Sequence, residues 1–340
     1  MSSEKIYTTY LLGAGASANA LPMVIDMHDR MTQFLAVMRA KVGDQHGWDP
    51  LFDMIKYSRE YGTPDTYAKI LKLMGDRKYE RFKDLISLFM LFEQMPFDWD
   101  EFNKFPSIDK ELLGKSLRTL DYRYAQFIAS VFDTVHLSSL DNSKIRIITW
   151  NYDIQFEMLL STILKLKHPE VMKLTAWKIE HAEQAMDTTK GFITRVNGCC
   201  DFALDKENKD YLFKPSMSLD EFSKFFERVI FSGRTSYFNH LHFAWENDES
   251  SLPYWSRLRA NQILSKTHQL VIIGYSFPNY NRLVDKGIIS GFQGKVHLQG
   301  NGNLDQIEER LKSIVHSTSK GRIKQVNYSD QFFIPDDILV

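Results

Sequence analysis

The chain has 340 residues, a formal net charge of -1 and 44% hydrophobic residues, an ordinary composition for a globular protein. This length suits one large domain or two modest ones, and we interpret residues 1–340 as a single domain. A charge this close to zero provides no general basic field, so neither direct nucleic-acid binding nor attraction to an anionic membrane is indicated. Cys199 and Cys200 are the only cysteines, which excludes a disulfide framework and a cysteine-rich zinc module.

The sequence also carries no sign of targeting to a membrane. Its first residues, MSSEKIYTTYLL, lack the basic and apolar regions of a signal peptide. No run of about 18 apolar residues is long enough to span a bilayer. Together with the low cysteine content, these features predict a cytoplasmic protein.

Short apolar segments rich in β-branched residues alternate with helical patterns. The first predicted strand covers residues 6–12 and ends in a glycine turn. Further strands are predicted at 145–149, 192–196, 270–273, 295–298 and 323–326. Strands that alternate with helices predict an α/β fold with a Rossmann-like, mainly parallel sheet and helices on both faces.

Helical patterns begin soon after the glycine turn. Residues 18–35 are predicted to form a helix with Pro22 near its start, and residues 153–167 also look helical. Between about residues 30 and 140, aromatic and aliphatic side chains recur at intervals of three and four. We expect this block to be a helical insertion between the first and second strands, packed over or beside the ligand cleft.

Residues 13–18 (GAGASA) fit a strand–GxGxxA–helix turn. In such a turn the glycines let the backbone approach a pyrophosphate, and the N–H groups of the next helix bind the anion. The alternative is a packing turn without a ligand. A dinucleotide dehydrogenase would also need a second strand ending in an acidic residue about 20 residues further on. Asp26 and Asp29 lie in a helical pattern instead, which argues against hydride transfer.

Polar or glycine residues follow several of the predicted strands, where a parallel sheet binds its ligands. In chain order these residues are Asn151 and Asp153, then Asn197, then Gly274 and Ser276. Taken alone, Asn151 and Asp153 could simply cap the following helix, and Asn197-Gly198 is an ordinary turn signal. Several such strand ends in one sheet favour a shared ligand cleft.

In this order, the segments resemble those of the sirtuin-like family, and most closely its bacterial antiphage-defence branch. Residues 13–17 with Pro22 downstream resemble the GAGxS signature, and residues 149–153 (TWNYD) resemble the TxNxD segment. Residues 196–198 (VNG) stand where the family has LHG, and residues 272–278 (IIGYSFP) are similar to the GYSFP segment. Residues 296–301 (VHLQGN) stand where a strand ends in an adenosine-side Asn. The helical block has no counterpart among these motifs.

The resemblance implies an NAD pocket that needs no metal. In this resemblance the pyrophosphate would be bound by Gly13, Ala14 and Gly15, and Ser17 would lie near the nicotinamide. Asn151 would orient the nicotinamide ribose and a water, and Asp153 would bind the carboxamide of nicotinamide. The adenosine half would be contacted by Gly274, Ser276 and Asn301. The catalytic His of the family falls on Asn197, and an amide cannot accept a proton. Either amides position the water, or a nearby His (His28, His168 or His181) substitutes, or the protein binds NAD without cleaving it.

The leading hypothesis is therefore an NAD hydrolase that releases nicotinamide and ADP-ribose and depletes NAD in antiphage defence. An alternative is a sensor or scaffold subunit that binds NAD or ADP-ribose without turnover. An NAD-dependent deacylase is disfavoured because the zinc cysteines of that class are missing. An unregulated NAD hydrolase would kill its host, so we expect control by homo-oligomerisation or by an activating partner protein.

Overall fold

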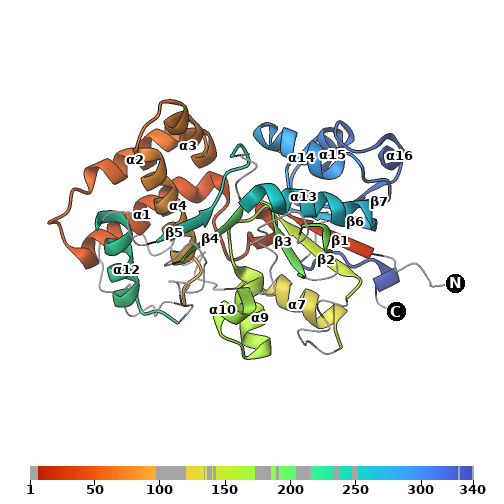
Figure 1. Ribbon diagram of the computed structural model, residues 1–340, viewed down its shortest axis with the longest axis horizontal. Helices are drawn as coiled ribbons and strands as arrows, with labels where there is room; N and C mark the ends of the chain where they lie inside the picture. Colours follow the sequence, from red (N-terminus) through yellow and green to blue (C-terminus); the bar gives the residue numbers. More distant parts are fainter. Residues whose placement is uncertain are drawn as a thin grey trace.

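The computed structural model describes residues 7–96, 120–133, 143–172, 191–203, 216–232, 237–246, 252–327 and 330–338, together with residues 135, 140, 185–188 and 214. Its central sheet has six strands in the order β3-β2-β1-β6-β7-β8 (Figure 1). Every pairing between neighbouring strands of this sheet is parallel. The strands are β1 (Tyr7–Leu12), β2 (Ile145–Thr149), β3 (Ile193–Arg195), β6 (Thr267–Ile273), β7 (Lys295–Gln299) and β8 (Ile323–Val326).

The predicted α/β class is confirmed, and all six predicted strands occur. The largest difference is at β6, which begins at Thr267 instead of residue 270. Its polar start is explained by its position, because β6 lies between β1 and β7 and the Thr267 hydroxyl is 2.6 Å from that of Thr9 on β1. From β1 the chain adds β2 and β3 on one side, and the later strands β6, β7 and β8 lie on the other side. Sheets of this kind form a ligand crevice where the order of the strands changes in this way, here between β1 and β6.

Alternating side chains bury both faces of the sheet. Leu11, Ile148 and Ile272 point to one face, which is covered by α13 (Leu252–Ser265), α14 (Arg282–Ile289) and α15 (Leu304–Lys312). Tyr10 and Ile147 belong to the other face, which is covered by α7 (Tyr122–Val131), α9 (Gln155–Leu164) and α10 (His168–Met172). Figure 1 shows these two groups of helices on opposite sides of the strands. The short α16 (Ser317–Lys320) leads into β8.

A second group of helices and strands, which we call the helical lobe, lies to one side of the sheet and its covering helices (Figure 1). It contains α1 (Val24–Val42), α2 (Asp49–Glu60), α3 (Pro64–Leu73) and α4 (Lys78–Phe92). Three elements from after β3 complete it: α12 (Leu219–Phe231) and the antiparallel strands β4 (Gly198–Ala203) and β5 (Phe238–Leu241). None of the helices in the described residues combines the length and the apolar character needed to cross a bilayer.

The predicted insertion is therefore correct in its helices but not in its extent. Within about 30–140, α7 packs on the sheet and not on the lobe, and residues 97–119 lie outside the described part of the chain. β4 and β5 were not predicted, because the buried segment GCCDFA of β4 shows no alternation of polar and apolar residues. The lobe is thus built from two separate stretches of sequence.

Two helix boundaries also differ from prediction. The helix expected from residue 18 begins at Val24, after a single 3-10 turn at Ala14–Ser17. Pro22 explains the delay, since a residue preceding proline avoids the helical conformation. The helix expected over 153–167 covers only Gln155–Leu164, and Lys165 ends it with a left-handed φ of 54°.

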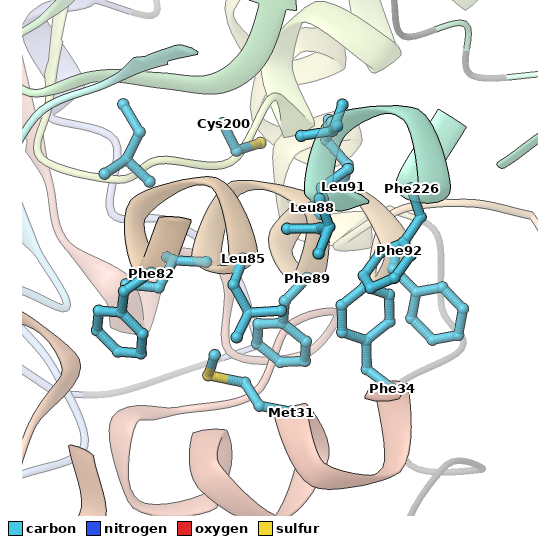
Figure 2. Close-up of a cluster of buried hydrophobic side chains, with 14 of the residues drawn as sticks. Met31, Phe34, Phe82, Leu85, Leu88, Phe89, Leu91, Phe92, Cys200 and Phe226 are labelled. Atoms are coloured by element: carbon cyan, nitrogen blue, oxygen red, sulfur yellow. The ribbon is translucent and has the colours of Figure 1, made fainter. Parts of the chain in front are cut away.

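The core of the helical lobe is a cluster of aromatic and aliphatic side chains from α1, α4 and α12 (Figure 2). Phe34 of α1 is 1% exposed and lies at its centre. The Phe34 ring is 4.9 Å from that of Phe92 and 5.5 Å from that of Phe226. Such tilted and edge-on ring pairs add to the free energy gained by burial. This cluster holds together helices that are far apart in the sequence.

We predict that Phe34→Ala lowers the free energy of unfolding by about 3–5 kcal/mol, because it leaves a cavity at this contact. The matched control is Leu73→Ala on α3, where the leucine is 76% exposed. Urea unfolding followed by circular dichroism measures both. Equal stability of the two variants would contradict this placement of the core.

Candidate functional site

A cavity of about 480 Å³ lies at the carboxyl ends of the central strands, between the sheet and the helical lobe. Its volume is in the range of small-molecule binding sites. Nine of the ten residues predicted for the site line it: Ala14, Gly15, Ser17, Asn151, Asp153, Asn197, Gly274, Ser276 and Asn301. The exception is Gly13, which packs against the backbone of Gly274 and Tyr275. The structure thus brings together residues from five separate segments of the sequence.

The glycines at the end of β1 pack directly on the backbone that follows β6. A Cβ atom on Gly13 would lie 2.6 Å from the carbonyl oxygen of Gly274, and one on Gly15 would lie 2.7 Å from the Cα of Gly274. Gly274 itself has a φ of +63°, and its own Cβ would lie 2.4 Å from the Cα of Gly15. The Gly15 N–H donates to the Gly274 carbonyl over 3.0 Å. Packing alone therefore requires these glycines, whatever ligand the neighbouring Ala14 contacts.

Arg123 of α7 holds the glycine turn from behind. Its Nη2 atom donates to the carbonyl oxygens of Gly15 and Ala16, each over 3.1 Å. The same guanidinium pairs with Asp121 over 2.6 Å, and both side chains are buried. Because Asp121 also caps the start of α7, the position of this helix fixes the shape of the turn.

The Ser17 hydroxyl is fully engaged by other side chains of the site. It donates its proton to Asp153 Oδ2 over 2.8 Å, so the Tyr124 hydroxyl, 2.8 Å away, must donate to Ser17. The Asn151 Nδ2 atom donates to the same oxygen over 3.3 Å. Ser17 therefore holds Asn151 and Asp153 in place and has no proton left for a ligand.

Asn151 is positioned from both its side chain and its backbone. Its N–H donates to the Thr149 hydroxyl over 3.0 Å, and its carbonyl accepts from Arg195 over 3.1 Å. Arg195 forms a buried two-point pair with Glu157, at 2.8 and 2.6 Å. Among the described residues no donor contacts the Asn151 amide oxygen, so this oxygen is available as an acceptor in the cavity.

The side chain of Asn197 presents the opposite polarity. Its amide oxygen accepts from Arg257 Nη2 over 3.1 Å, which leaves the Nδ2 donor for the cavity. Burial lowers the pKa of Arg257 to about 10, so the guanidinium stays charged at neutral pH. Asn151 can therefore accept a hydrogen bond from a bound molecule, and Asn197 can donate one.

Of the three His candidates, only His28 has a described side chain, and it does not line the cavity. His28 is buried and its Nε2 lies 3.0 Å from the Ser58 hydroxyl. The side chain of His168, at the start of α10, and the whole of His181 lie outside the described part of the structure. His242, which the sequence analysis did not single out, donates its backbone N–H to the Asn197 carbonyl over 2.9 Å, but its ring pairs with Glu246.

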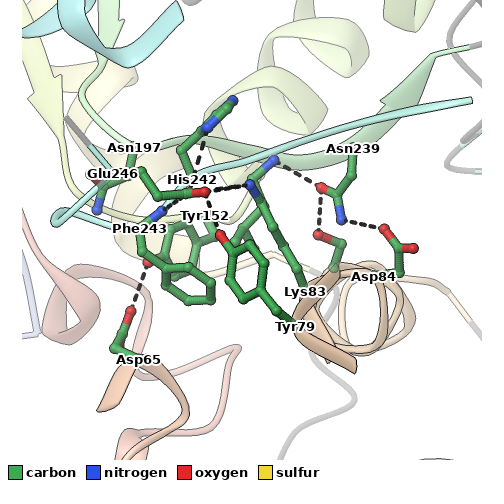
Figure 3. A network of polar contacts seen from close by, with 12 residues as sticks. Asp65, Tyr79, Lys83, Asp84, Tyr152, Asn197, Asn239, His242, Phe243 and Glu246 are labelled. Carbon is green, nitrogen blue, oxygen red and sulfur yellow. Dashed lines mark hydrogen bonds and ion pairs between the residues drawn. The ribbon is translucent and has the colours of Figure 1, made fainter. Parts of the chain in front are cut away.

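Glu246 organises a polar cluster behind the cavity wall (Figure 3). It contacts the Tyr79 hydroxyl, Lys83 Nζ at 3.1 Å and the Phe243 N–H at 2.7 Å. Burial acts to raise its pKa, but hydrogen bonds and the charge of Lys83 hold that pKa well below its usual range. The cluster fixes Phe243, whose ring lines the cavity, against α4.

The cavity is lined by acidic and aromatic side chains. Asp65 and Asp153 line it, whereas no Lys, Arg or His is found among the described lining residues. Burial raises the pKa of the Asp153 carboxyl, and Arg195 and the Ser17 hydroxyl oppose that rise. Aromatic walls are formed by Trp150 and Tyr275, whose rings stack 5.4 Å apart at 9°. A positively charged, flat ring suits such a lining.

Asp65 was not predicted as a site residue. It lies in the first turn of α3 and accepts a hydrogen bond from the Tyr152 hydroxyl over 3.0 Å (Figure 3). The sequence Thr63-Pro64-Asp65 is typical of an ordinary helix start, and Thr63 does cap α3. Only the packing of the lobe onto the sheet reveals that this carboxyl group faces the cavity.

Comparison with models of known protein families gives no match, and no curated protein matches the chain either. In the described residues, no group of three or more His, Cys, Asp or Glu side chains is arranged to hold a metal ion. The interpretation of the site therefore depends on its own geometry.

We predict that Gly274→Ala destabilises the protein by about 1–2 kcal/mol from its left-handed backbone alone, with a further loss from the clash with Gly15. The control is Gly287→Ala in α14, where nothing lies within 4 Å of an added Cβ and alanine favours the helix. Thermal unfolding compares the two variants. A Gly274→Ala protein as stable as the wild type would refute the close contact.

Proposed function

We propose that this chain is a sirtuin-like NAD hydrolase, which cleaves NAD to nicotinamide and ADP-ribose. The observation that carries the proposal is the convergence of the family-like segments on one cavity. The glycine turn, Asn151 and Asp153, Asn197, and the loop after β6 with Asn301 beyond β7 all line it. The ends of parallel strands meet at one edge of any such sheet, so the support comes from which residues stand at these ends and from their resemblance to the segments of the family.

The chemistry of the lining supports NAD as the substrate. The nicotinamide ring of NAD is a cation, and its departure leaves an oxocarbenium-like sugar that also carries positive charge. Asp65 and Asp153 are placed to stabilise such charge, and buried carboxylates do so more strongly than exposed ones. The pyrophosphate would lie against the backbone of Ala14 and Gly15, since no basic side chain is among the described lining residues.

The two amides supply the positioning that hydrolysis needs. In this proposal the Asn151 oxygen accepts a hydrogen bond from a ribose hydroxyl or from the attacking water, and the Asn197 Nδ2 donates a hydrogen bond to the oxygen of that water. Nicotinamide leaves as a neutral molecule, so orientation of the water contributes a large part of the rate. With neither amide able to take the proton, we expect slow or conditionally activated hydrolysis.

A second candidate is a subunit that binds NAD or ADP-ribose without cleaving it. Asn197 favours this candidate, because its amide oxygen is occupied by Arg257 and only a donor faces the cavity. An NAD-dependent deacylase of the zinc-containing class receives no support. Cys199 and Cys200 are both fully buried, and burial raises the pKa of the Cys199 thiol to about 12.

We further propose that the enzyme acts in the cytoplasm in antiphage defence and that assembly or a partner protein controls it. Exposed apolar side chains at the mouth of the cavity support a contact surface there. Ile25, which lines the cavity, is 84% exposed, and Tyr280 is 40% exposed. Clustered apolar side chains on a surface commonly mark binding sites.

We predict that Asn151→Ala abolishes measurable NAD cleavage, a loss of about 10²–10³-fold or more, because it removes a group that orients the reacting atoms. The fold should survive, since the side chain makes a single 3.3 Å contact with Ser17. Nicotinamide release followed by chromatography measures the activity, and Asn279→Ala, at an exposed position, is the control. Full activity of Asn151→Ala would remove this residue from the site.

The same assay separates the two candidate functions. Release of nicotinamide by the wild-type protein, in vitro or in cells that produce it, supports the hydrolase. Calorimetric binding of NAD without any release under either condition would instead establish the binding subunit.

A further inference from the structure

We propose that Asp65 is the general base of the reaction, the group that accepts the proton of the attacking water. The inference rests on the proposed hydrolysis of NAD and adds to it a residue from the helical lobe. It answers the question raised by Asn197, which stands where a proton acceptor is expected but cannot be one.

The position of Asp65 carries the proposal. Its carboxyl group lines the same cavity as Asn151 and Asn197, and the Tyr152 hydroxyl donates to its Oδ1 atom over 3.0 Å. Tyr152 lies between Asn151 and Asp153 in the sequence, so this hydrogen bond ties the lobe to the end of β2. The carboxyl group thus accepts from Tyr152 (Figure 3) and also interacts with the backbone of its own residue. A carboxylate has about four acceptor positions, so it can still accept a hydrogen bond from a water molecule.

The other polar groups of the described lining are less suited to take a proton. Both oxygens of Asp153 are engaged, Oδ2 by the Ser17 hydroxyl and Oδ1 by the Gln155 N–H. The amides of Asn151 and Asn197 are not basic. The Tyr275 hydroxyl donates to Asp285 over 2.8 Å, and burial holds the pKa of Tyr152 and of Tyr275 well above the usual range. Asp65 is the remaining carboxylate of the described lining.

The surroundings of Asp65 give it the proton affinity of a base that works near neutral pH. Burial raises its pKa to about 6, and the hydrogen bond from Tyr152 opposes part of that rise. Tyr280, which interacts electrostatically with Asp65, stays neutral because burial raises its own pKa. Glu246 and Arg257 also interact electrostatically with Tyr152. The carboxylate therefore predominates above pH 6 and is lost as the pH falls through this value.

The step balances without any further reactant. The bond between the ribose carbon and the nicotinamide nitrogen breaks, and its electron pair leaves with nicotinamide. The water oxygen forms the new bond to that carbon, and one water proton passes to Asp65. The products are nicotinamide and ADP-ribose, and the proton is later released to solvent. Asp65 returns to its starting state.

The test compares Asp65→Asn with the wild-type protein in the nicotinamide-release assay across pH 5–8. Loss of a general base should lower kcat by about 10²–10⁴-fold while KM changes little, because the amide keeps the shape of the carboxyl group. The wild-type kcat should fall below a pH of about 6, and this acidic limb should vanish in the variant. Asp65→Glu should recover part of the rate. Asp53→Asn, at an exposed position on α2, is the control.

The pH profile of Tyr152→Phe provides a second test, because a purely structural role of Asp65 would not produce the expected shift of the acidic limb. Removing the donor raises the pKa of the carboxyl group, so the acidic limb should move to higher pH while the rate above it persists. An Asp65→Asn protein with wild-type kcat, or with an unchanged acidic limb, overturns the assignment of Asp65 but leaves the hydrolase intact. A wild-type protein that releases no nicotinamide in vitro or in cells overturns both proposals.

Discussion

The contact between two glycine backbones, at the ends of β1 and β6, is the constraint on which the rest of the site depends. An added Cβ at Gly15 or Gly274 would lie within 2.7 Å of the other residue's backbone, so neither position accepts a side chain without movement of a strand. This approach brings the turn after β1 against the loop after β6, and the cavity opens beside their junction. Arg123 then holds the turn from the other side, so three elements distant in sequence determine its shape.

A second constraint is the set of hydrogen bonds that fixes which end of each side-chain amide faces the cavity. The Asn151 Nδ2 donates to Ser17, and the Asn197 amide oxygen accepts from Arg257. An amide can rotate by half a turn at little cost in shape, so without these partners each side chain would present either face. With them, the cavity offers an acceptor from Asn151 and a donor from Asn197. Preorganisation of this kind requires that the supporting side chains be buried and paired, as Arg195 and Glu157 are.

The sequence was sufficient to predict the parallel sheet and the lining residues that directly follow its strands, because both depend on local patterns. β-branched runs mark the strands, and the residues directly after them must lie at one edge of a parallel sheet. Asp65 and Arg257 could not be found in this way. In the sequence Asp65 looks like part of an ordinary helix start, and Arg257 is one of two arginines in α13. Each acquires its role only when its helix packs against the sheet. The strand β4 was missed because complete burial removes the alternation by which a strand is recognised.

Asn197 lies on a joint between two separately packed bodies. β3 ends at Arg195 within the sheet, and β4 begins at Gly198, whose neighbours Cys199 and Cys200 belong to the core of the lobe. Along the chain, Asn197 thus follows a strand of the sheet and precedes a strand of the helical lobe. The cavity that it lines also lies between the sheet and the lobe. A force that displaces the lobe relative to the sheet is transmitted to this amide through the one or two peptide units that join it to β4 and to β3. Mechanical coupling of that kind would let an event on the outer surface of the lobe alter the alignment of the reacting atoms without touching the cavity.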